Sequence, residues 1–186
     1  MNPSINQAGL TLIELLLVMS LAVILTAIGV PSYRYVTTSN RIAGEINGLL
    51  GDLEYARYEA IKEGMNVQIC PAASASANTC DAGQTTWSEG WIVLSNSLDN
   101  PSGTSVVLRR QLPFTSFNSN DTLTGSLGLT SLTFNREGFS TQTGSRMFSL
   151  HDPNNNTGFT RCLIIDGPGA MSTTTAGNTV LAMTCS

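Results

Sequence analysis

The chain has 186 residues, a length typical of one domain with at most a small appendage. Its formal net charge of −4 argues against general electrostatic binding of nucleic acid, although this net charge is compatible with a small local basic patch. The single histidine, His151, argues against an enzyme built on a histidine cluster and against a multi-histidine metal site. Charged residues make up 12% of the chain, about half the usual share for a soluble domain.

An apolar segment covers residues 10–30 and contains one charged side chain, that of Glu14. Its 21 residues rise about 1.5 Å each as a helix, which is enough to cross the ~30 Å apolar core of a bilayer. A cleaved secretory signal is the alternative, but residues 1–9 contain no Lys or Arg and no small-x-small cleavage site stands out after the segment. The sequence therefore predicts a single-pass transmembrane anchor followed by one domain.

The residues around Glu14 form a motif, and a carboxylate in an apolar helix is costly unless it is paired. The string Gly9-Leu10-Thr11-Leu12-Ile13-Glu14 closely resembles the class III leader of type IV pilins and of type II secretion pseudopilins. The resemblance implies that a prepilin peptidase removes residues 1–9 by cutting after Gly9, and that Leu10 is then N-methylated, which keeps its charge. It also implies that Glu14 neutralises the terminal ammonium of a neighbouring subunit during assembly, and that Pro31 kinks the helix.

Two features of the leader depart from the family pattern. Leu10 stands where these families usually have Phe, and the leader lacks their usual Lys or Arg. Because Arg34 and Arg41 both follow the apolar segment, the positive-inside rule does not support an orientation. The resemblance alone implies that the anchor lies in the bacterial inner membrane with the C-terminal domain in the periplasm.

The helix is predicted to continue over residues 31–64 as an amphipathic segment that ends at a C-cap, Gly64. Apolar side chains at a 4-3-4-3-4 spacing form one stripe, which Leu50 and Ile61 widen: Ile42, Ile46, Leu49, Leu53, Ala56 and Ala60. The charged side chains are predicted to lie off this stripe: Glu45, Asp52, Glu54, Arg57, Glu59, Lys62 and Glu63. The stripe predicts that this half of the helix packs on a sheet of its own domain.

The rest of the chain, residues 65–186, is predicted to form a β-rich domain. Strands are expected over residues 65–70, 90–95, 105–111, 127–134, 145–150, 159–166 and 179–183, with a bulge inside the fourth. Turn signals separate them at residues 99–101, 135–138, 152–154 and 167–169, and the Ser/Thr/Asn-rich stretches 115–126 and 153–160 are expected to be loops. The predicted class is α+β, with antiparallel sheets or a sandwich packed on the long helix.

Several short patterns in this domain extend the resemblance over the whole chain. Their order resembles the GspH/FimT family of minor pilins and pseudopilins: Cys70-Pro71, Cys80, Trp87, Gly90-Trp91-Ile92-Val93, Leu132-Thr133-Phe134-Asn135-Arg136-Glu137-Gly138 and Arg161-Cys162-Leu163-Ile164-Ile165. The family implies a type IV pilin-like fold. Trp91 and Phe134 are expected to be core residues rather than ligand contacts.

Four cysteines, Cys70, Cys80, Cys162 and Cys185, all follow the membrane segment. An even number in an oxidising compartment indicates disulfides, and four cysteines permit three connectivities. Pairing Cys70 with Cys80 and Cys162 with Cys185 is favoured because each bond closes a local loop. A zinc site would need closer C-x₂₋₄-C pairs than these spacings provide.

Catalysis and DNA binding are both weakly supported. His151 and Asp152 are adjacent, so their side chains cannot be assumed to meet, and the sequence lacks a G-x-S-x-G motif. Some family members in naturally competent bacteria bind DNA through a C-terminal G-R-x-R loop, but here Ala170 and Ser172 replace both arginines. The remaining candidate for a nucleic-acid site is a basic patch of Arg109, Arg110, Arg136 and Arg146. The favoured interpretation, however, is that these arginines lie at ordinary solvated ends of strands and loops.

The expected function is that of a structural minor pilin-like subunit of a type IV pilus-type filament, in its assembly-priming or tip complex. The alternative is the minor pseudopilin H of a type II secretion system, and a DNA-binding competence pilin is less favoured. No enzymatic activity, cofactor or metal is expected. The expected partners are other minor and major pilins or pseudopilins, the prepilin peptidase, the inner-membrane assembly platform and the membrane.

Overall fold

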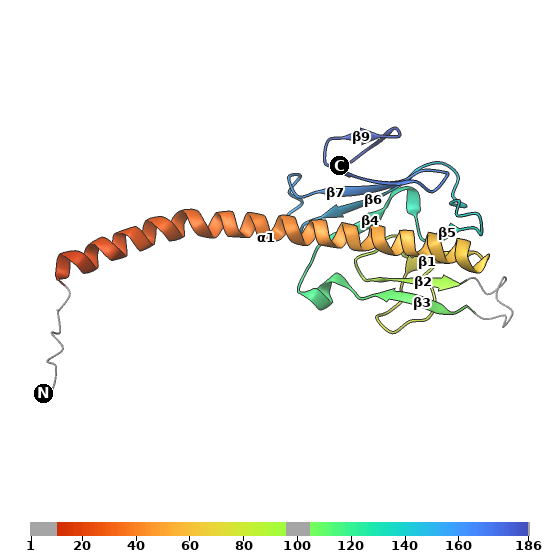
Figure 1. The fold of residues 1–186 in the computed structure, drawn as a ribbon, viewed down its shortest axis with the longest axis horizontal. Helices are drawn as coiled ribbons and strands as arrows, with labels where there is room; N and C mark the ends of the chain where they lie inside the picture. Colours follow the sequence, from red (N-terminus) through yellow and green to blue (C-terminus); the bar gives the residue numbers. More distant parts are fainter. Residues whose placement is uncertain (1–10, 96–104, 186) are drawn as a thin grey trace, which may run out of the picture. The chain divides into compact units, whose positions relative to one another are not determined.

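The computed structural model describes residues 11–95 and 105–185. The predicted leader, the Gly9–Leu10 junction and the turn expected at residues 99–101 lie outside these ranges. The chain divides into two compact units, residues 1–38 and 39–186, and one helix, α1 (Leu12–Glu63), runs through both (Figure 1).

In the first unit, α1 is an apolar helix whose side chains are exposed. Residues 11–37 are all exposed, and an 18-residue window of this helix is long and apolar enough to cross a membrane. The hydroxyls of Ser20 and Thr26 donate hydrogen bonds to the carbonyls of Leu17 and Ala22, so neither hydroxyl is left unpaired on the apolar surface. Residues 12–37 of the helix are therefore compatible with an apolar environment.

In the second unit, α1 buries one face. All six predicted stripe residues are buried, whereas Ile61 is exposed. Asp52 and Glu59, which were predicted to lie off the stripe, are buried as well, because each lies beside a stripe residue on the helical wheel. The helix ends at Gly64, which has a φ of +65°, and the Met65 amide donates to the Ala60 carbonyl in the manner of a glycine cap.

Two antiparallel four-stranded sheets pack with α1 in the second unit (Figure 1). The first sheet has the order β3-β2-β1-β5, formed by β1 (Val67–Pro71), β2 (Trp91–Ser95), β3 (Val107–Gln111) and β5 (Leu132–Phe134). The second has the order β4-β6-β7-β8, formed by β4 (Thr122–Gly125), β6 (Arg146–His151), β7 (Arg161–Ile165) and β8 (Met171–Thr175). A small hairpin pairs β9 (Thr179–Val180) with β10 (Met183–Thr184).

The main core joins the helix stripe to side chains from both sheets. Trp91 and Phe134 lie in this core, as predicted. Trp87 donates its indole N–H to the Leu129 carbonyl at 3.0 Å and meets the Phe148 ring edge to face, with ring centroids 4.8 Å apart. The predicted α+β class, with a long helix packed on antiparallel sheets, is confirmed.

Four sequence expectations about the strands are wrong. The stretch 115–126, expected to be a loop, contains the 3₁₀ turn η1 (Phe114–Phe117) and β4, which has one buried side chain, Leu123, and is held by pairing with β6. β8 was not predicted, because its sequence MSTTT has no apolar alternation. It is a strand because it pairs with β7. Both are edge strands, where cross-strand pairing outweighs the weak local pattern.

The other two errors concern strands that are shorter than expected. Within residues 127–134, only Leu132–Phe134 is a strand, because Leu127 adopts a φ of +53° in the 3₁₀ turn η2 (Ser126–Gly128) and is 78% exposed. No bulge is therefore needed there. Residues 179–183 form not one strand but the β9–β10 hairpin, whose turn places Leu181 and Ala182 at positive φ.

Candidate functional site

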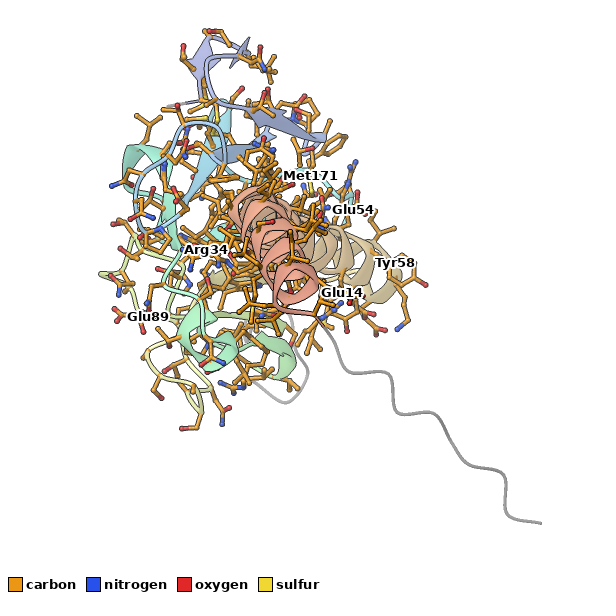
Figure 2. The ribbon with its side chains drawn as sticks, turned by 90° about the vertical axis from the view of Figure 1, so that its left-hand side faces the viewer. Glu14, Arg34, Glu54, Tyr58, Glu89 and Met171 are labelled. Atoms are coloured by element: carbon orange, nitrogen blue, oxygen red, sulfur yellow. A yellow bond between two sulfur atoms is a disulfide. The ribbon has the colours of Figure 1, made fainter. Side chains whose placement is uncertain are left out.

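The apolar side chains of α1 in the first unit form an exposed surface. It is formed by leucine, isoleucine, valine and methionine side chains of residues 12–36, which are between 50% and 81% exposed. Contiguous apolar surfaces of this kind mark contacts with a membrane or with other proteins. Glu14 is the acidic residue within this stretch and Arg34 is the basic one. The Glu14 side chain projects from the first helical turn (Figure 2).

The local geometry of Glu14 resembles a capping arrangement. Its amide N–H donates to the Thr11 hydroxyl at 3.3 Å, so Thr11 caps the helix three residues before the acid. A carboxylate in the first turn also interacts favourably with the positive end of the helix dipole. Among the described residues, no cation lies within ion-pair distance of Glu14, so its charge is available to another molecule.

Three further predicted residues on this part of the chain are untested by the geometry. Gly9 and Leu10 lie outside the described residues, so the cleavage and methylation sites remain predictions. Pro31 lies inside α1, which continues through it. A kink at Pro31 therefore also remains a prediction.

In the second unit, an ionic cluster fastens α1 to the segment before β4. Arg41 donates from Nε and Nη2 to the two carboxylate oxygens of Asp121, each at 2.7 Å, and the Asp121 side chain is fully buried. Glu45, one turn after Arg41, lies beside Asp121 and Ser119, and its Oε2 atom is buried without a hydrogen-bond partner among the described residues. Burial, reinforced by the hydrogen bond to Asp121, raises the pKa of Glu45 to about 7.

The raised pKa predicts that Glu45 lowers stability at neutral and alkaline pH. The folded chain keeps a proton that the unfolded chain, with a pKa of 4.5, releases, so stability falls as the pH rises from about 4.5 to about 7. Glu45→Gln should therefore gain about 1–2 kcal/mol over the wild type at pH 8 and almost nothing at pH 4, after allowance for partial solvent screening. Thermal unfolding of the full chain in detergent at both pH values measures this, with Glu54→Gln on the exposed helix surface as the control. A gain that is equal at both pH values would contradict the assignment.

A second polar contact fastens α1 to the first sheet through Asp52. One Asp52 oxygen accepts the indole N–H of Trp91 at 2.8 Å, and the other accepts Nε of Arg109 at 2.8 Å. The Arg109 guanidinium also lies over the Tyr55 ring, 5.4 Å from its centroid. The pKa of Asp52 is raised, because the effect of burial outweighs the lowering by the Trp91 hydrogen bond and by the Arg109 charge.

This contact predicts different costs for two substitutions. Asp52→Ala should lower the free energy of unfolding by about 2 kcal/mol, because it leaves the buried Trp91 N–H without an acceptor. Asp52→Asn should cost less than about 1 kcal/mol, because the amide oxygen can still accept from Trp91 and the half-exposed Arg109 pair contributes little. Chemical denaturation of both variants checks the difference. Equal costs would show that the ion pair, not the indole hydrogen bond, dominates.

Both disulfides join the cysteines that the local-loop argument pairs. Cys70 is bonded to Cys80, beside an isolated bridge between Ala72 and Cys80, and this bond closes a loop before β2. Cys162 of β7 is bonded to Cys185, which ties the β9–β10 hairpin to the second sheet. Cys162 and Cys185 are buried in a small apolar cluster with Met147 and Ile164.

Residues 169–172, which were considered as the position of a DNA-binding loop, lie at the end of the β7–β8 connection and the start of β8. Gly169, with a φ of +85°, accepts a hydrogen bond from Arg57 at 3.1 Å, and a Cβ at this position would lie 3.2 Å from the Gly138 carbonyl oxygen. Asp166 accepts the Ala170 amide at 2.7 Å and closes the β7–β8 connection. The segment therefore fastens the hairpin to α1 and presents no cation.

The four arginines proposed as a basic patch are each engaged locally. Arg109 pairs with Asp52, and Arg110 donates to the Ala75 carbonyl and the Asn78 side chain. Arg136 pairs with its neighbour Glu137, and Arg146 donates to the Ser145 carbonyl. His151 and Asp152 also face different partners, Thr160 and the Asn156 amide.

Sequence reasoning missed the clusters around Asp121 and Asp52. Arg41 and Asp121 are 80 positions apart, and no local pattern links them. Asp52 offered a weak signal, since it directly precedes the stripe residue Leu53 and lies three positions after Leu49.

Comparison with known proteins identifies one family and one fold. The family model described as Type II transport protein GspH matches residues 45–169. A crystal structure of the type IV minor pilin FimU from Pseudomonas aeruginosa (strain PAO1) is similar at 22% identity and a TM-score of 0.56, over 72% of this chain and 87% of that chain. A second crystal form of FimU is similar at 23% identity and a TM-score of 0.52, over 73% of this chain and 91% of that chain. No curated protein matches the chain.

Proposed function

Because this chain belongs to the GspH family of minor pilins and pseudopilins, we propose that it is a structural subunit of a type IV pilus-type filament, placed in the complex that primes assembly or caps the tip. The observation that carries the proposal is the exposed apolar surface of α1 with Glu14 at its start. In a soluble protein, such a surface would be exposed to water and would promote aggregation. A subunit that resides first in a membrane and then in a helical filament core requires it.

The proposed mechanism has three steps, which involve Gly9, Leu10 and Glu14. A prepilin peptidase cuts after Gly9, and N-methylation of Leu10 leaves a positively charged terminus inside the membrane. When the subunit leaves the membrane for the filament, Glu14 of one subunit pairs with the terminal ammonium of its neighbour. The attraction within an ion pair inside an apolar bundle offsets part of the desolvation cost of both charges. The pair therefore favours the register in which Glu14 of one subunit meets the terminus of the next.

We place the anchor in the bacterial inner membrane and the second unit in the periplasm. Two disulfides in the second unit support an oxidising compartment. The partners in this proposal are other pilins or pseudopilins, the prepilin peptidase and the inner-membrane assembly platform. The role is structural, without a catalytic centre, a cofactor or nucleic acid.

The second candidate is the minor pseudopilin H of a type II secretion system, which the description of the matching family favours. Both roles use the same helix chemistry, so the geometry does not separate them. Deletion of the gene separates the two roles. Loss of surface pili and twitching with normal secretion supports the pilus, whereas loss of exoprotein secretion with normal pili supports the pseudopilus.

Processing of the leader gives a direct prediction. The chain extracted from a membrane with active prepilin peptidase should have an intact mass that corresponds to residues 10–186 plus one methyl group. Gly9→Leu should block cleavage, because the peptidase recognises the small residue before the scissile bond, and should leave the full-length mass. Retention of residues 1–9 in the wild-type chain would overturn the proposed processing.

A further inference from the structure

The two four-stranded sheets have four edge strands, and three of these edges are covered or charged. Residues 85–87 pair with the outer side of β4, and residues 139–141 pair with the outer side of β5, in both cases through backbone hydrogen bonds and an isolated bridge. The third edge strand, β3, carries two adjacent arginines, Arg109 and Arg110. Covering segments and charged side chains are the usual means by which proteins keep an edge strand from pairing with another chain.

The fourth edge strand, β8, has neither protection in the described part of the chain. Its sequence MSTTT contains no charged residue and no proline, and β7 is the strand with which it pairs. The Asp166 amide donates to the Ala170 carbonyl at 3.1 Å, which sets the alternation along the β7–β8 pair. The backbone N–H and C=O groups of Met171 and Thr173 therefore point away from β7. They form an open template for one further strand.

A small polar pocket adjoins this open edge. It has a volume of about 210 Å³ and lies between β8 and α1. Thr173 and Thr175 of β8 line it, together with Ile46 and Asn47 of α1 and Arg161 of β7. Arg161 is the register partner of Thr175, so the charged group of the pocket lies directly beside the end of the open edge.

The Arg161 guanidinium has no carboxylate partner among the described residues. Its Nη1 atom donates to the Gly158 and Thr160 carbonyls at 3.3 and 2.9 Å, which leaves Nε and Nη2 without an acceptor in residues 11–95 and 105–185. Arg41 uses the same two atoms, Nε and Nη2, to hold both carboxylate oxygens of Asp121. A carboxylate from another molecule can bind Arg161 in the same bidentate manner.

We propose that β8 binds an extended segment of a partner protein as a fifth strand of the second sheet, and that an Asp or Glu side chain of this segment binds Arg161. The open backbone groups provide hydrogen bonds to any extended segment, whereas Arg161 selects one that carries an acid. A second copy of this chain is the poorer occupant, because β8 has no carboxylate to offer to Arg161. The contact is additional to the helix contacts of the proposed function.

Hydrogen exchange of the purified full-length chain in detergent tests whether the edge is open. The Thr173 amide points away from β7 and should exchange at least about a hundredfold faster than the Ser172 and Thr174 amides, which point toward β7. Equal protection of the three amides would show that the edge is already covered and would overturn the proposal.

Photocrosslinking of the full-length chain in cells that assemble the filament tests the occupant. A photoreactive phenylalanine at Ser172, an exposed position of β8, should crosslink to a partner protein. Mass spectrometry of the crosslinked peptide should find an Asp or Glu within about four residues of the attachment point, the distance along a strand from Ser172 to Arg161. The same probe at Leu127, which is 78% exposed and outside β8, is the control and should give about tenfold less product.

Two substitutions in the chain that carries the Ser172 probe test how the segment binds. Thr173→Pro removes an outward N–H without breaking a bond to β7, and should reduce the crosslink at least about tenfold. Arg161→Gln removes the charge and should also reduce it about tenfold. Arg136→Gln is the matched control, because it removes an arginine that is 73% exposed and pairs with its own neighbour, and it should leave the crosslink unchanged.

Each outcome supports or overturns a stated part of the proposal. A variant counts as folded when its unfolding midpoint lies within about 3 °C of that of its parent, and either substitution alone suffices if the other fails this criterion. A crosslink that survives Thr173→Pro overturns the added strand, and one that survives Arg161→Gln overturns the carboxylate contact. A crosslink from Ser172 to β8 of a second copy overturns the proposed occupant. A Ser172 crosslink no stronger than that from Leu127 overturns the site.

Discussion

Glu14→Ala is expected to leave the chain inserted in the membrane but to reduce its incorporation into filaments to less than about a tenth of the wild-type level. Removal of a carboxylate from an apolar helix eases insertion. In the filament, however, the variant leaves the terminal ammonium of a neighbouring subunit without its counter-charge. An unpaired charge in an apolar bundle costs several kcal/mol, and each 1.4 kcal/mol corresponds to about a factor of ten in the assembly equilibrium. Quantification of the chain in membrane and sheared-filament fractions measures both effects.

Two further variants separate the charge of Glu14 from its position in the first helical turn. Glu14→Gln keeps a side chain that can take part in the capping arrangement but removes the charge, so it should fail in assembly as Glu14→Ala does. Thr11→Ala removes the hydroxyl that accepts the Glu14 amide but keeps the charge, and should assemble at close to the wild-type level. If Glu14→Gln assembles normally and Thr11→Ala does not, Glu14 acts through helix capping and the proposed ion pair is wrong.

Replacement of Cys162 and Cys185 together by serine is expected to lower the free energy of unfolding by about 3 kcal/mol. The bond joins residues 23 positions apart, and the loss of this constraint increases the entropy of the unfolded chain. The folded chain is affected as well, because the β9–β10 hairpin has two residues in each strand and depends on the Cys185 attachment to β7. Termini fray unless they are tied down, so residues 179–184 should lose their protection against hydrogen exchange.

The other disulfide provides the matched control for this experiment. Cys70→Ser together with Cys80→Ser opens a loop of similar order in the first sheet and should cost a comparable free energy. Its exchange effects should be confined to residues 72–90, while the C-terminal hairpin stays protected. Unchanged exchange at residues 179–184 after loss of the Cys162–Cys185 bond would show that packing of the cluster with Met147 and Ile164 holds the tail without the bond.

The sequence predicted the helix and its buried stripe because helical periodicity is a local property of the chain. The burial of Ile42, Ile46 and Leu49 follows directly from spacings of four and three residues. The cysteine pairs were also predictable, since each pair closes a short loop. Strands with alternating or continuous apolar residues, such as Trp91–Ser95 and Arg161–Ile165, were found for the same reason.

The features that the sequence did not reveal depend on contacts between distant segments. β4 and β8 have few apolar residues, and only their pairing with β6 and β7 makes them strands. Glu14 was identified from its motif, whereas the acid–arginine cluster around Asp121 has no motif and required the folded structure.

Top-down mass spectrometry of purified filaments tests the central claim most directly. The account predicts that the filament fraction contains this chain as residues 10–186, with one methyl group on Leu10 and both disulfides intact, in small amounts relative to the major subunit. The Glu14→Ala chain should be nearly absent from the same fraction while it remains in the membrane. A wild-type chain found only in the membrane fraction, with residues 1–9 still attached, would contradict the account.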